Sequence, residues 1–401
     1  MSDASSGPLA GIRVIELGQI LAGPFTTTML GYFGAEVIKI EAPGAGDPIR
    51  GWRTVRNGTS LWWHSHARNK KSVTINLKSP DGQQMVRDLC QHADVLVENF
   101  RPGQMERWGL GPEPIKAINP ELIYTRISGY GQTGPDASKP GFASVCEGFG
   151  GFRYVNGIPG ERPVRPNLSI GDTLAGIHAA LGVCLALIAR LRGKSDGGQV
   201  VDVSIFESVF NLLEGVVPEY SGAGQIREPA GTTITGIAPS NTYRCGDDKL
   251  IVIGANTDPM FERLMRAMGR DDLAEDPGLS SNAGRVEQQE MLDDAIEAWT
   301  RTMTMTQALA ALEEASVAGG PIYSVEDMFN DPQYQARELL ESVTVDGEPL
   351  VIPAIVPRLT ETPGSTRWTG PKLGQHTDEV LSELLELSEE ARSQLRSDGV
   401  I

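Results

Sequence analysis

Short runs of β-branched residues alternate with helical segments along the first half of the chain, and this alternation constrains the fold more than any other feature. The runs are expected as strands over residues 12–17, 35–40, 72–77, 94–98, 122–128 and 199–204. Strands that alternate with helices of about 10–15 residues predict an α/β fold with an open, largely parallel sheet. In such sheets ligands bind at the carboxyl ends of the strands. The loops after Leu17, Glu98 and Ser128 are therefore the places to look for chemistry.

The later part of the chain has a different pattern, which indicates a second domain. A chain of 401 residues is long enough for two or three domains. We expect a smaller α+β domain inserted into a large Rossmann-like domain. The expected parts are a large α/β domain over 9–214, a Gly- and Pro-rich linker over 215–242, the small domain over 243–325 and a C-terminal part over 326–401 that returns to the large domain.

Charge and composition exclude several classes of protein. The formal net charge of −17 argues against nucleic acid as a partner, because phosphate backbones are bound by clustered Lys and Arg. The N-terminus has no basic start or apolar core and is not expected to be a signal peptide. The apolar stretch 177–188 is too short to span a bilayer and is expected as a buried helix, so no membrane partner is expected. Four scattered cysteines favour a reducing, cytoplasmic location.

Several cofactor motifs are missing or incomplete. The glycines of the stretch 129–134 match a dinucleotide loop, but Pro135 follows and no helix can open there. No G-x-x-x-x-G-K-[ST] motif for a nucleoside triphosphate is present. His64 and His66 have no third ligand at metal-binding spacing. We therefore expect no metal and no permanently bound cofactor.

Asp172 stands just ahead of a long apolar helix predicted over 174–192. It could simply be the N-cap of that helix, since Asp is among the commonest caps. The same position also suits a nucleophile, because a helix N-terminus stabilises a carboxylate through its dipole and free N–H groups. Gly171 beside it would leave the backbone open to a bulky ligand. An ionised, approachable carboxylate is a possible covalent nucleophile.

Cationic residues cluster in two places. One cluster is the run 68–71, and the other consists of Arg50, Arg53 and Arg56 in a Trp-rich loop. Both could be solvated surface. The alternative is recognition of phosphate or carboxylate groups, for which an Arg fork is well suited.

Taken together, these residues resemble the class III CoA-transferases, the family of formyl-CoA and carnitine-CoA transferases. The matching segments are 8–17 (PLAGIRVIEL), 21–24 (LAGP), 34–41 (GAEVIKIE), 43–47 (PGAGD), 68–72 (RNKKS), 97–103 (VENFRPG), 129–135 (GYGQTGP), 171–172 (GD) and 373–377 (LGQHT). So many segments in the same order, over nearly the whole chain, make the resemblance specific.

The resemblance implies an interlocked homodimer and assigns roles to particular residues. Asp172 corresponds to the catalytic aspartate of the family. A coenzyme A thioester is the implied substrate, and its implied binding residues are Arg68, Lys70, Lys71, Asn99, Arg101 and Met105. The implied residues for the acyl group and the acid are Gln19, Leu21 and Phe142, to which we add Arg50 and Arg53 because their cluster could hold a distal carboxylate.

The implied activity is transfer of CoA from an acyl-CoA to a carboxylic acid through an aspartyl-CoA thioester. The segments look closest to the branch that uses succinyl-CoA and dicarboxylates. The alternative is an α-methylacyl-CoA racemase, but the His-Asp pair of that branch is replaced by Phe142 and Ala143, which cannot move a proton. The missing hydroxyl at this position also argues against formate or oxalate. A third possibility is a CoA-binding protein without activity.

Overall fold

The structure is a computed structural model that describes residues 7–401. Its internal contacts divide the chain into two compact units. The first unit contains residues up to Phe152, Pro166–Glu214 and Gln335–Ile401, and the second contains Arg153–Arg165 and Gly215–Tyr334. The insertion of a small domain, the interlocked dimer and the expected domain boundaries stay predictions.

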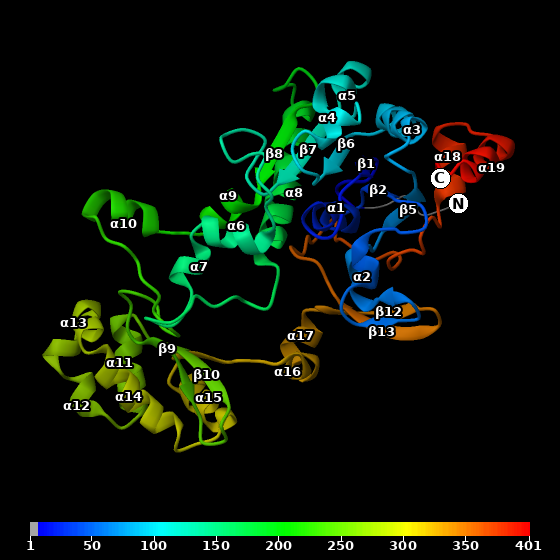
Figure 1. The fold of residues 1–401 in the computed structure, drawn as a ribbon. Helices are drawn as coiled ribbons and strands as arrows, with labels where there is room; N and C mark the ends of the chain where they lie inside the picture. Colours follow the sequence, from blue (N-terminus) through cyan, green and yellow to red (C-terminus); the bar gives the residue numbers. More distant parts are fainter. Residues whose placement is uncertain (1–6) are drawn as a thin grey trace. The chain divides into compact units, whose positions relative to one another are not determined.

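A six-stranded sheet forms the centre of the first unit (Figure 1). The strand order is β5-β2-β1-β6-β7-β8, and all neighbouring pairs are parallel. The strands are β1 (Arg13–Glu16), β2 (Glu36–Glu41), β5 (Lys70–Thr74), β6 (Val95–Glu98), β7 (Ile123–Ser128) and β8 (Val200–Ser204). The predicted open parallel sheet is confirmed. Because the chain builds one half of the sheet outward from β1 and the other outward from β6, the strand order reverses between these two strands.

Helices cover both faces of this sheet. Side chains alternate along each strand, so that Val14 of β1 joins the core on one face and Ile15 joins the core on the other. The Val14 face packs against α1 (Ala22–Tyr32) and α8 (Ile170–Leu191). The Ile15 face packs against α3 (Pro80–Gln91), α5 (Pro112–Ile118) and α18 (Thr377–Leu384).

Shorter elements complete the N-terminal and C-terminal parts of the first unit. They include two β-hairpins, one before and one after residues 215–334 in the sequence. The elements are η1 (Pro48–Gly51), β3 (Val55–Arg56), β4 (Thr59–Ser60), α2 (Leu61–His66), α4 (Gln104–Arg107), α6 (Ala143–Phe149), α9 (Ile205–Phe210), β12 (Leu340–Val345), β13 (Glu348–Pro353) and α19 (Glu389–Ser397).

Helix α8 differs from its expected form in length and in burial. It begins at Ile170, before the expected start, and an 18-residue window within it has a mean hydropathy of 2.0. By length and composition it could cross a membrane, so the expectation of a stretch that is too short is corrected. One face of the helix, which includes Ala179 and Val183, is nevertheless buried against the sheet, as in core helices. The other face is exposed, with Leu181 and Leu185 at its centre.

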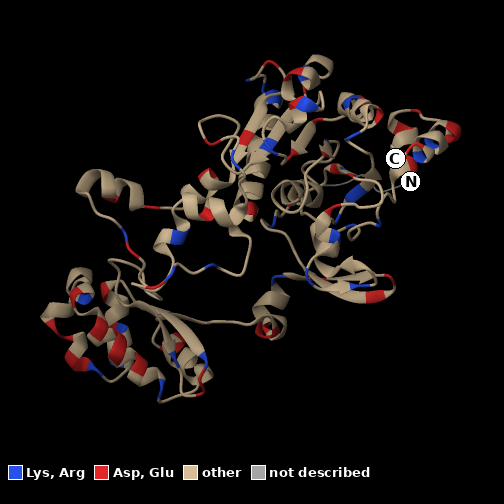
Figure 2. Cartoon of the chain, viewed as in Figure 1, with Lys and Arg blue, Asp and Glu red and all other residues tan. Residues whose placement is uncertain are grey.

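The second unit is built on a three-stranded antiparallel sheet of order β11-β10-β9. Its strands are β9 (Ser240–Arg244), β10 (Leu250–Gly254) and β11 (Ala318–Pro321). Its helices are α10 (Val216–Ala223), α11 (Asp258–Ala267), α12 (Asp271–Ala274), η2 (Pro277–Leu279), α13 (Asn282–Glu287), α14 (Gln289–Thr300), α15 (Met305–Glu314) and α16 (Val325–Asn330). Figure 2 shows acidic residues along several of these helices. The segment expected as a linker over 215–242 thus contains α10.

Two short helices cross the boundary between the units in the sequence. They are α7 (Phe152–Val155) and α17 (Pro332–Ala336). The chain between 325 and 336 forms two helices and not one, since α16 ends at Asn330 and α17 begins afresh at Pro332. The reason is the proline, since the residue before it, Asp331, is forced into the extended region with a ψ of 126°.

All four cysteines are free thiols, and three of them are buried. The cytoplasmic location that the cysteine pattern favours stays a prediction.

Candidate active site

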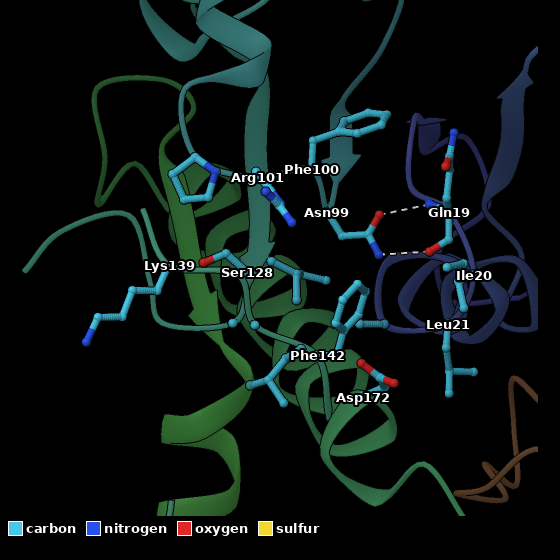
Figure 3. Close-up of a pocket in the computed structure, with 16 residues that line it drawn as sticks. Gln19, Ile20, Leu21, Asn99, Phe100, Arg101, Ser128, Lys139, Phe142 and Asp172 are labelled. Atoms are coloured by element: carbon cyan, nitrogen blue, oxygen red, sulfur yellow. Dashed lines mark hydrogen bonds between the residues drawn. The ribbon is translucent and has the colours of Figure 1, made fainter. Parts of the chain in front are cut away.

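A cavity of about 170 Å³ opens at the carboxyl ends of β1, β6 and β7 (Figure 3). It lies where the strand order reverses, which is the usual ligand position in open α/β sheets. The loops after these three strands line it together with residues from 139–142, the first turn of α8 and the start of α9. The lining residues are Gln19, Ile20, Leu21, Ala22, Asn99, Phe100, Arg101, Pro102, Ile127, Ser128, Gly129, Lys139, Gly141, Phe142, Asp172 and Ile205.

Asp172 lies in the cavity wall as the third residue of α8. The N-cap position that was considered for it is taken by Ser169 instead. The N-cap explanation is therefore wrong, and Asp172 sits inside the first helical turn. A carboxylate there is still stabilised by the helix dipole and by backbone N–H groups without helical partners. In Figure 3 the Asp172 carboxylate points into the cavity near Leu21.

Gly171 serves packing rather than ligand access. A Cβ atom at this position would lie 2.9 Å from Cγ2 of Ile205 and 3.4 Å from Cγ of Glu147. The buried carboxylate of Glu147 accepts a hydrogen bond from the Gly171 N–H at 3.3 Å. The expectation that this glycine opens the backbone to a ligand is thus corrected. The glycine instead lets α6 and α9 press against the turn that carries Asp172.

The glycine-rich stretch after β7 has a similar explanation. A Cβ on Gly129 would lie 2.7 Å from Cα of Gly141, so the two backbones pass in direct contact. This close approach carries Phe142 to the cavity, where it lies beside Asp172 in Figure 3. The glycines therefore shape the wall of the cavity, and no helix follows them that could form a dinucleotide loop.

The structure brings six of the sequence-predicted residues to one cavity. They are Gln19, Leu21, Asn99, Arg101, Phe142 and Asp172. Lys139 also lines the cavity and was missed by the sequence analysis. Its ammonium lies 2.7 Å from a carboxylate oxygen of Asp136 and its side chain is 59% exposed, so it remains open to a ligand. The sequence signal that could have indicated Lys139 is its position in the glycine-rich loop after a predicted strand, directly before Pro140 and Gly141.

The two arginines expected near the substrate lie elsewhere. Arg50 makes two hydrogen bonds of 2.8 and 2.7 Å to the carboxylate of Glu41, and its guanidinium lies 3.7 Å from the ring centre of Trp63. Arg53 stacks over Trp62 at 4.5 Å. Neither lines the cavity. The partner, Glu41, ends β2 nine residues before Arg50, and the folding of the intervening loop brings the two together.

The expected CoA ligands Lys70 and Lys71 are both held in ion pairs. Lys70 is fully buried, and its ammonium lies 2.9 Å from Glu16. Lys71 bridges Glu36 at 3.0 Å and Glu379 at 2.7 Å. The alternation of β5 sends these neighbours to opposite faces of the sheet. The resemblance implied that both residues bind CoA, but neither of them lines this cavity.

Arg68 and Met105 are also remote from the cavity lining. Arg68 is buried and donates to Glu341 of the β12–β13 hairpin at 3.2 Å. Met105 is fully buried in the core on the Ile15 face. Its apolar side chain and its position on α4 explain this placement.

A strong charge network lies behind the cavity wall that follows β6. Glu98 is buried and accepts a hydrogen bond from Arg126 at 2.9 Å and another from the Phe100 N–H at 2.7 Å. Arg126 also binds Glu106 at 2.7 Å, so one guanidinium serves two carboxylates. Burial raises the pKa of Glu98 to about 7, against the opposing effect of Arg126. This network fixes the backbone that presents Asn99, Phe100 and Arg101.

This fold and this cavity define an α/β enzyme whose candidate nucleophile lies at the strand-order reversal. The model of CoA-transferase family III matches residues 9–377, and the chain belongs to this family. It is therefore a CoA-transferase.

Three similar proteins show how far the likeness extends. The chain is 48% identical to the succinyl-CoA–D-citramalate CoA-transferase of Chloroflexus aurantiacus, over 98% of both chains. It is 42% identical to the succinyl-CoA–L-malate CoA-transferase alpha subunit of Chloroflexus aurantiacus, over 98% of this chain and 92% of the relative. Among solved structures, a CAIB/BAIF family protein from Brucella suis superposes with a TM-score of 0.83 at 32% identity, over 94% of this chain and 99% of that one.

Proposed function

We propose that this CoA-transferase moves coenzyme A from succinyl-CoA to a dicarboxylic acid through a thioester on Asp172. The observation that carries the proposal is the Asp172 carboxylate, which faces the cavity from the first turn of α8. The names of the two Chloroflexus relatives, both succinyl-CoA-dependent, support the donor and the class of acceptor.

The proposed chemistry balances without a further reactant. A carboxylate oxygen of Asp172 attacks the thioester carbonyl of succinyl-CoA, the C–S bond breaks, and a mixed anhydride and the CoA thiolate form. The thiolate then attacks the Asp172 carbonyl carbon and releases succinate, which leaves an aspartyl-CoA thioester. The acceptor carboxylate repeats these two steps in reverse, departs as its CoA ester and restores Asp172. One thioester replaces another, so the exchange is close to thermoneutral.

The cavity offers groups for each part of the substrate. Arg101 and Lys139 are cations suited to the phosphates of coenzyme A. Gln19, Leu21 and Phe142 would contact the acyl group. The N-terminus of α8 favours negative charge at Asp172 before the attack and on each oxyanion that forms beside it.

We also propose a homodimer that covers the exposed face of α8. Four apolar side chains spaced three or four residues apart form this face: Ile177, Leu181, Leu185 and Ile188. A continuous apolar stripe of this kind on the surface of a chain marks an interaction site. A second copy of the chain is the proposed occupant, and the resemblance to a family of interlocked dimers supports it.

The activity is tested by mixing the pure protein with succinyl-CoA and a panel of acids that includes malate, citramalate, glutarate and acetate. Chromatography should detect a new CoA ester with at least one dicarboxylate. If no acid gives exchange above background, the substrate class is rejected. Deuterium uptake at the α-carbon of a 2-methylacyl-CoA, without exchange, would instead indicate a racemase.

The mechanism is tested by intact-protein mass spectrometry during turnover. We expect a CoA adduct on Asp172 that hydroxylamine removes. Asp172→Asn and Asp172→Ala should abolish both the adduct and the exchange. Asp196→Asn, at an exposed aspartate beyond the other end of α8, is the matched control and should keep both. An adduct on another residue, or turnover in Asp172→Ala, would contradict the assigned nucleophile.

A further inference from the structure

Four charged side chains are buried together directly behind the loop Gly18–Leu21. Glu16, Lys39, Asp47 and Lys70 are each at most 2% exposed. The Lys39 ammonium lies 2.7 Å from Glu16 and 2.8 Å from Asp47, and the Lys70 ammonium lies 2.9 Å from Glu16. Burying four charges is costly unless they are paired and fully hydrogen-bonded. The proposed mechanism uses none of these four side chains, so the free-energy cost of burying them requires another explanation.

This cluster is bonded to the backbone of the loop that lines the cavity. The carboxylate oxygens of Asp47 accept from the Ile20 N–H at 3.1 and 3.2 Å. Lys39 donates to the Gly18 carbonyl at 2.8 Å. His66 Nε2 lies 3.1 Å from the Ile20 carbonyl oxygen. Burial lowers the pKa of His66 to about 3, so the ring is neutral and carries its proton on Nε2.

The loop has a conformation that needs such support. Ile20 has a φ of +67°, in the left-handed region that a β-branched residue rarely adopts. Conformations of this kind persist only where the surroundings over-determine them, and they gather at functional sites. The turn at Ile20 lies between Gln19 and Leu21, which both line the cavity with Asp172.

We propose that Asp47 is a positioning residue of the transferase reaction: it holds Ile20 in the left-handed conformation and thereby sets Gln19 and Leu21 against the reacting groups at Asp172. The inference rests on the proposed function for its catalytic readout. Lys39 keeps Asp47 in place, Glu16 balances the charge of Lys39, and Lys70 in turn pairs with Glu16.

The geometry makes Asp47→Asn a sharp probe. Oδ1 of Asp47 also accepts from the Ile49 N–H at 3.0 Å, while Oδ2 faces the Lys39 ammonium. The asparagine keeps the size and the Oδ1 acceptor, but its NH2 group replaces Oδ2, which removes the second acceptor for the Ile20 N–H and sets two donors, this amide and the Lys39 ammonium, against each other. This repulsion should displace the side chain and loosen the clamp on Ile20 while the packing stays.

A cycle of variants separates positioning from general damage. We expect Asp47→Asn to lower kcat for CoA exchange by about 10–10² fold, with a smaller change in KM for succinyl-CoA. The reason is that Gln19 and Leu21 would shift relative to the reacting groups at Asp172. Ile20→Gly removes the strain at φ +67° and lowers kcat somewhat through the lost side chain. Adding Asp47→Asn to Ile20→Gly should then cost at least about threefold less than in the parent, because glycine needs no clamp to hold this φ.

Asp94→Asn is the matched control. Asp94 likewise accepts from a backbone N–H, that of Arg13 at 3.0 Å, and pairs with Arg190 at 2.8 Å. It directly precedes β6, however, and so lies at the amino ends of the strands, away from the cavity at their carboxyl ends. This variant should lower the unfolding temperature and leave kcat unchanged. An unchanged kcat in Asp47→Asn, or costs that simply add in the double variant, would overturn the inference.

Hydrogen–deuterium exchange of the loop peptide provides a readout that needs no activity. Asp47→Asn should speed amide exchange over Gly18–Leu21, and Asp94→Asn should not. If the loop stays as protected as in the parent, the clamp does not exist, whatever the enzyme does. If the loop loosens but the parent protein exchanges no CoA, the proposed function fails and the clamp stands as a structural device.

Discussion

The backbone of Gln19 and the side-chain amide of Asn99 exchange two hydrogen bonds, each 2.8 Å long (Figure 3). Gln19 follows β1 and Asn99 follows β6, so this pair ties together the two loops on either side of the strand-order reversal. Both residues line the cavity. One amide therefore fixes how the two halves of the cavity wall meet.

Asn99→Asp tests this tie. The variant places an oxygen where Nδ2 donates to the Gln19 carbonyl, so two acceptors oppose each other. We expect kcat for CoA exchange to fall by about 10² fold, since a displacement of about 1 Å in a catalytic wall has effects of that order. Steady-state kinetics with succinyl-CoA measures it.

The control for Asn99 is Asn119→Asp. Asn119 donates to the carbonyl groups of Cys90 and Ala93 at 2.8 and 2.9 Å. It precedes β7 and lies toward the amino ends of the strands, away from the cavity. It should lose stability to a similar extent and keep its kcat. Equal losses of kcat in the two variants would mean that the effect is general destabilisation.

Gly171→Ala should strain the turn that carries Asp172. The added methyl meets Cγ2 of Ile205 at 2.9 Å, and overpacking of this kind costs about 1–3 kcal/mol. Urea unfolding should show the loss in stability, and kinetics should show a lower kcat. Ile205→Ala removes the opposing methyl at its own cost in stability, so the test is a double-mutant cycle: Gly171→Ala should cost less in the Ile205→Ala background than in the parent. If the two costs simply add, Gly171 is required for a reason other than this contact.

Glu98 should make stability depend on pH between about 4.5 and 7. Burial raises its folded pKa to about 7 from the ordinary value of 4.5. Because the folded state holds the proton more tightly, the contribution is fully present below about pH 4.5 and is lost as the pH rises through about 7. One pKa unit is about 1.4 kcal/mol, so the loss over this window is about 3–4 kcal/mol.

Urea unfolding of the parent and of Glu98→Gln at several pH values checks this window. The difference between the two free energies of unfolding should shift against the parent as the pH rises from 4.5 to 7. The glutamine also changes the bond to Arg126, but that effect does not vary with pH. A constant difference across the window would show that Glu98 titrates at its ordinary pKa.

The exposed stripe of α8 gives a prediction about assembly. Leu181→Asp together with Leu185→Asp should convert the proposed dimer to monomers, because each change would bury an unpaired charge in an apolar interface. Size-exclusion chromatography with light scattering measures the mass. Ile118→Asp, at an exposed apolar residue of α5, is the control and should leave the assembly unchanged. A parent protein that is monomeric at all concentrations would contradict the proposal directly.

The alternation of strands and helices was sufficient to predict the parallel sheet, because its signals are local. The start of α8 was placed too late, since Ile170 and Gly171 carry no helical signal and the packing of α6 and α9 decides their conformation. Because the predicted start of the helix was a few residues too late, Asp172 was considered as the N-cap although it lies in the first turn. The resemblance nevertheless assigned Asp172 to the active site, and the residue does line the cavity.

The cationic residues show where local sequence stops being informative. Lys70 of β5 is bound by Glu16 of β1, and only the arrangement of the sheet brings these two residues together. Arg50 of η1 is bound by Glu41 at the end of β2, and the path of the loop between them, which no sequence motif reveals, makes this pair. Lys139 was missed for the complementary reason, since the contact between Gly129 and Gly141 is what carries its segment to the cavity.

The backbone of the Gly18–Leu21 loop has its polar groups engaged by Lys39, Asn99, Asp47 and His66. Redesign of this enzyme for other acids therefore has little freedom in the main chain here. A library that varies the side chains at 19, 21 and 142 while leaving the buried acids and bases untouched should yield altered selectivity, whereas transplanting the loop alone into a related scaffold should yield inactive protein.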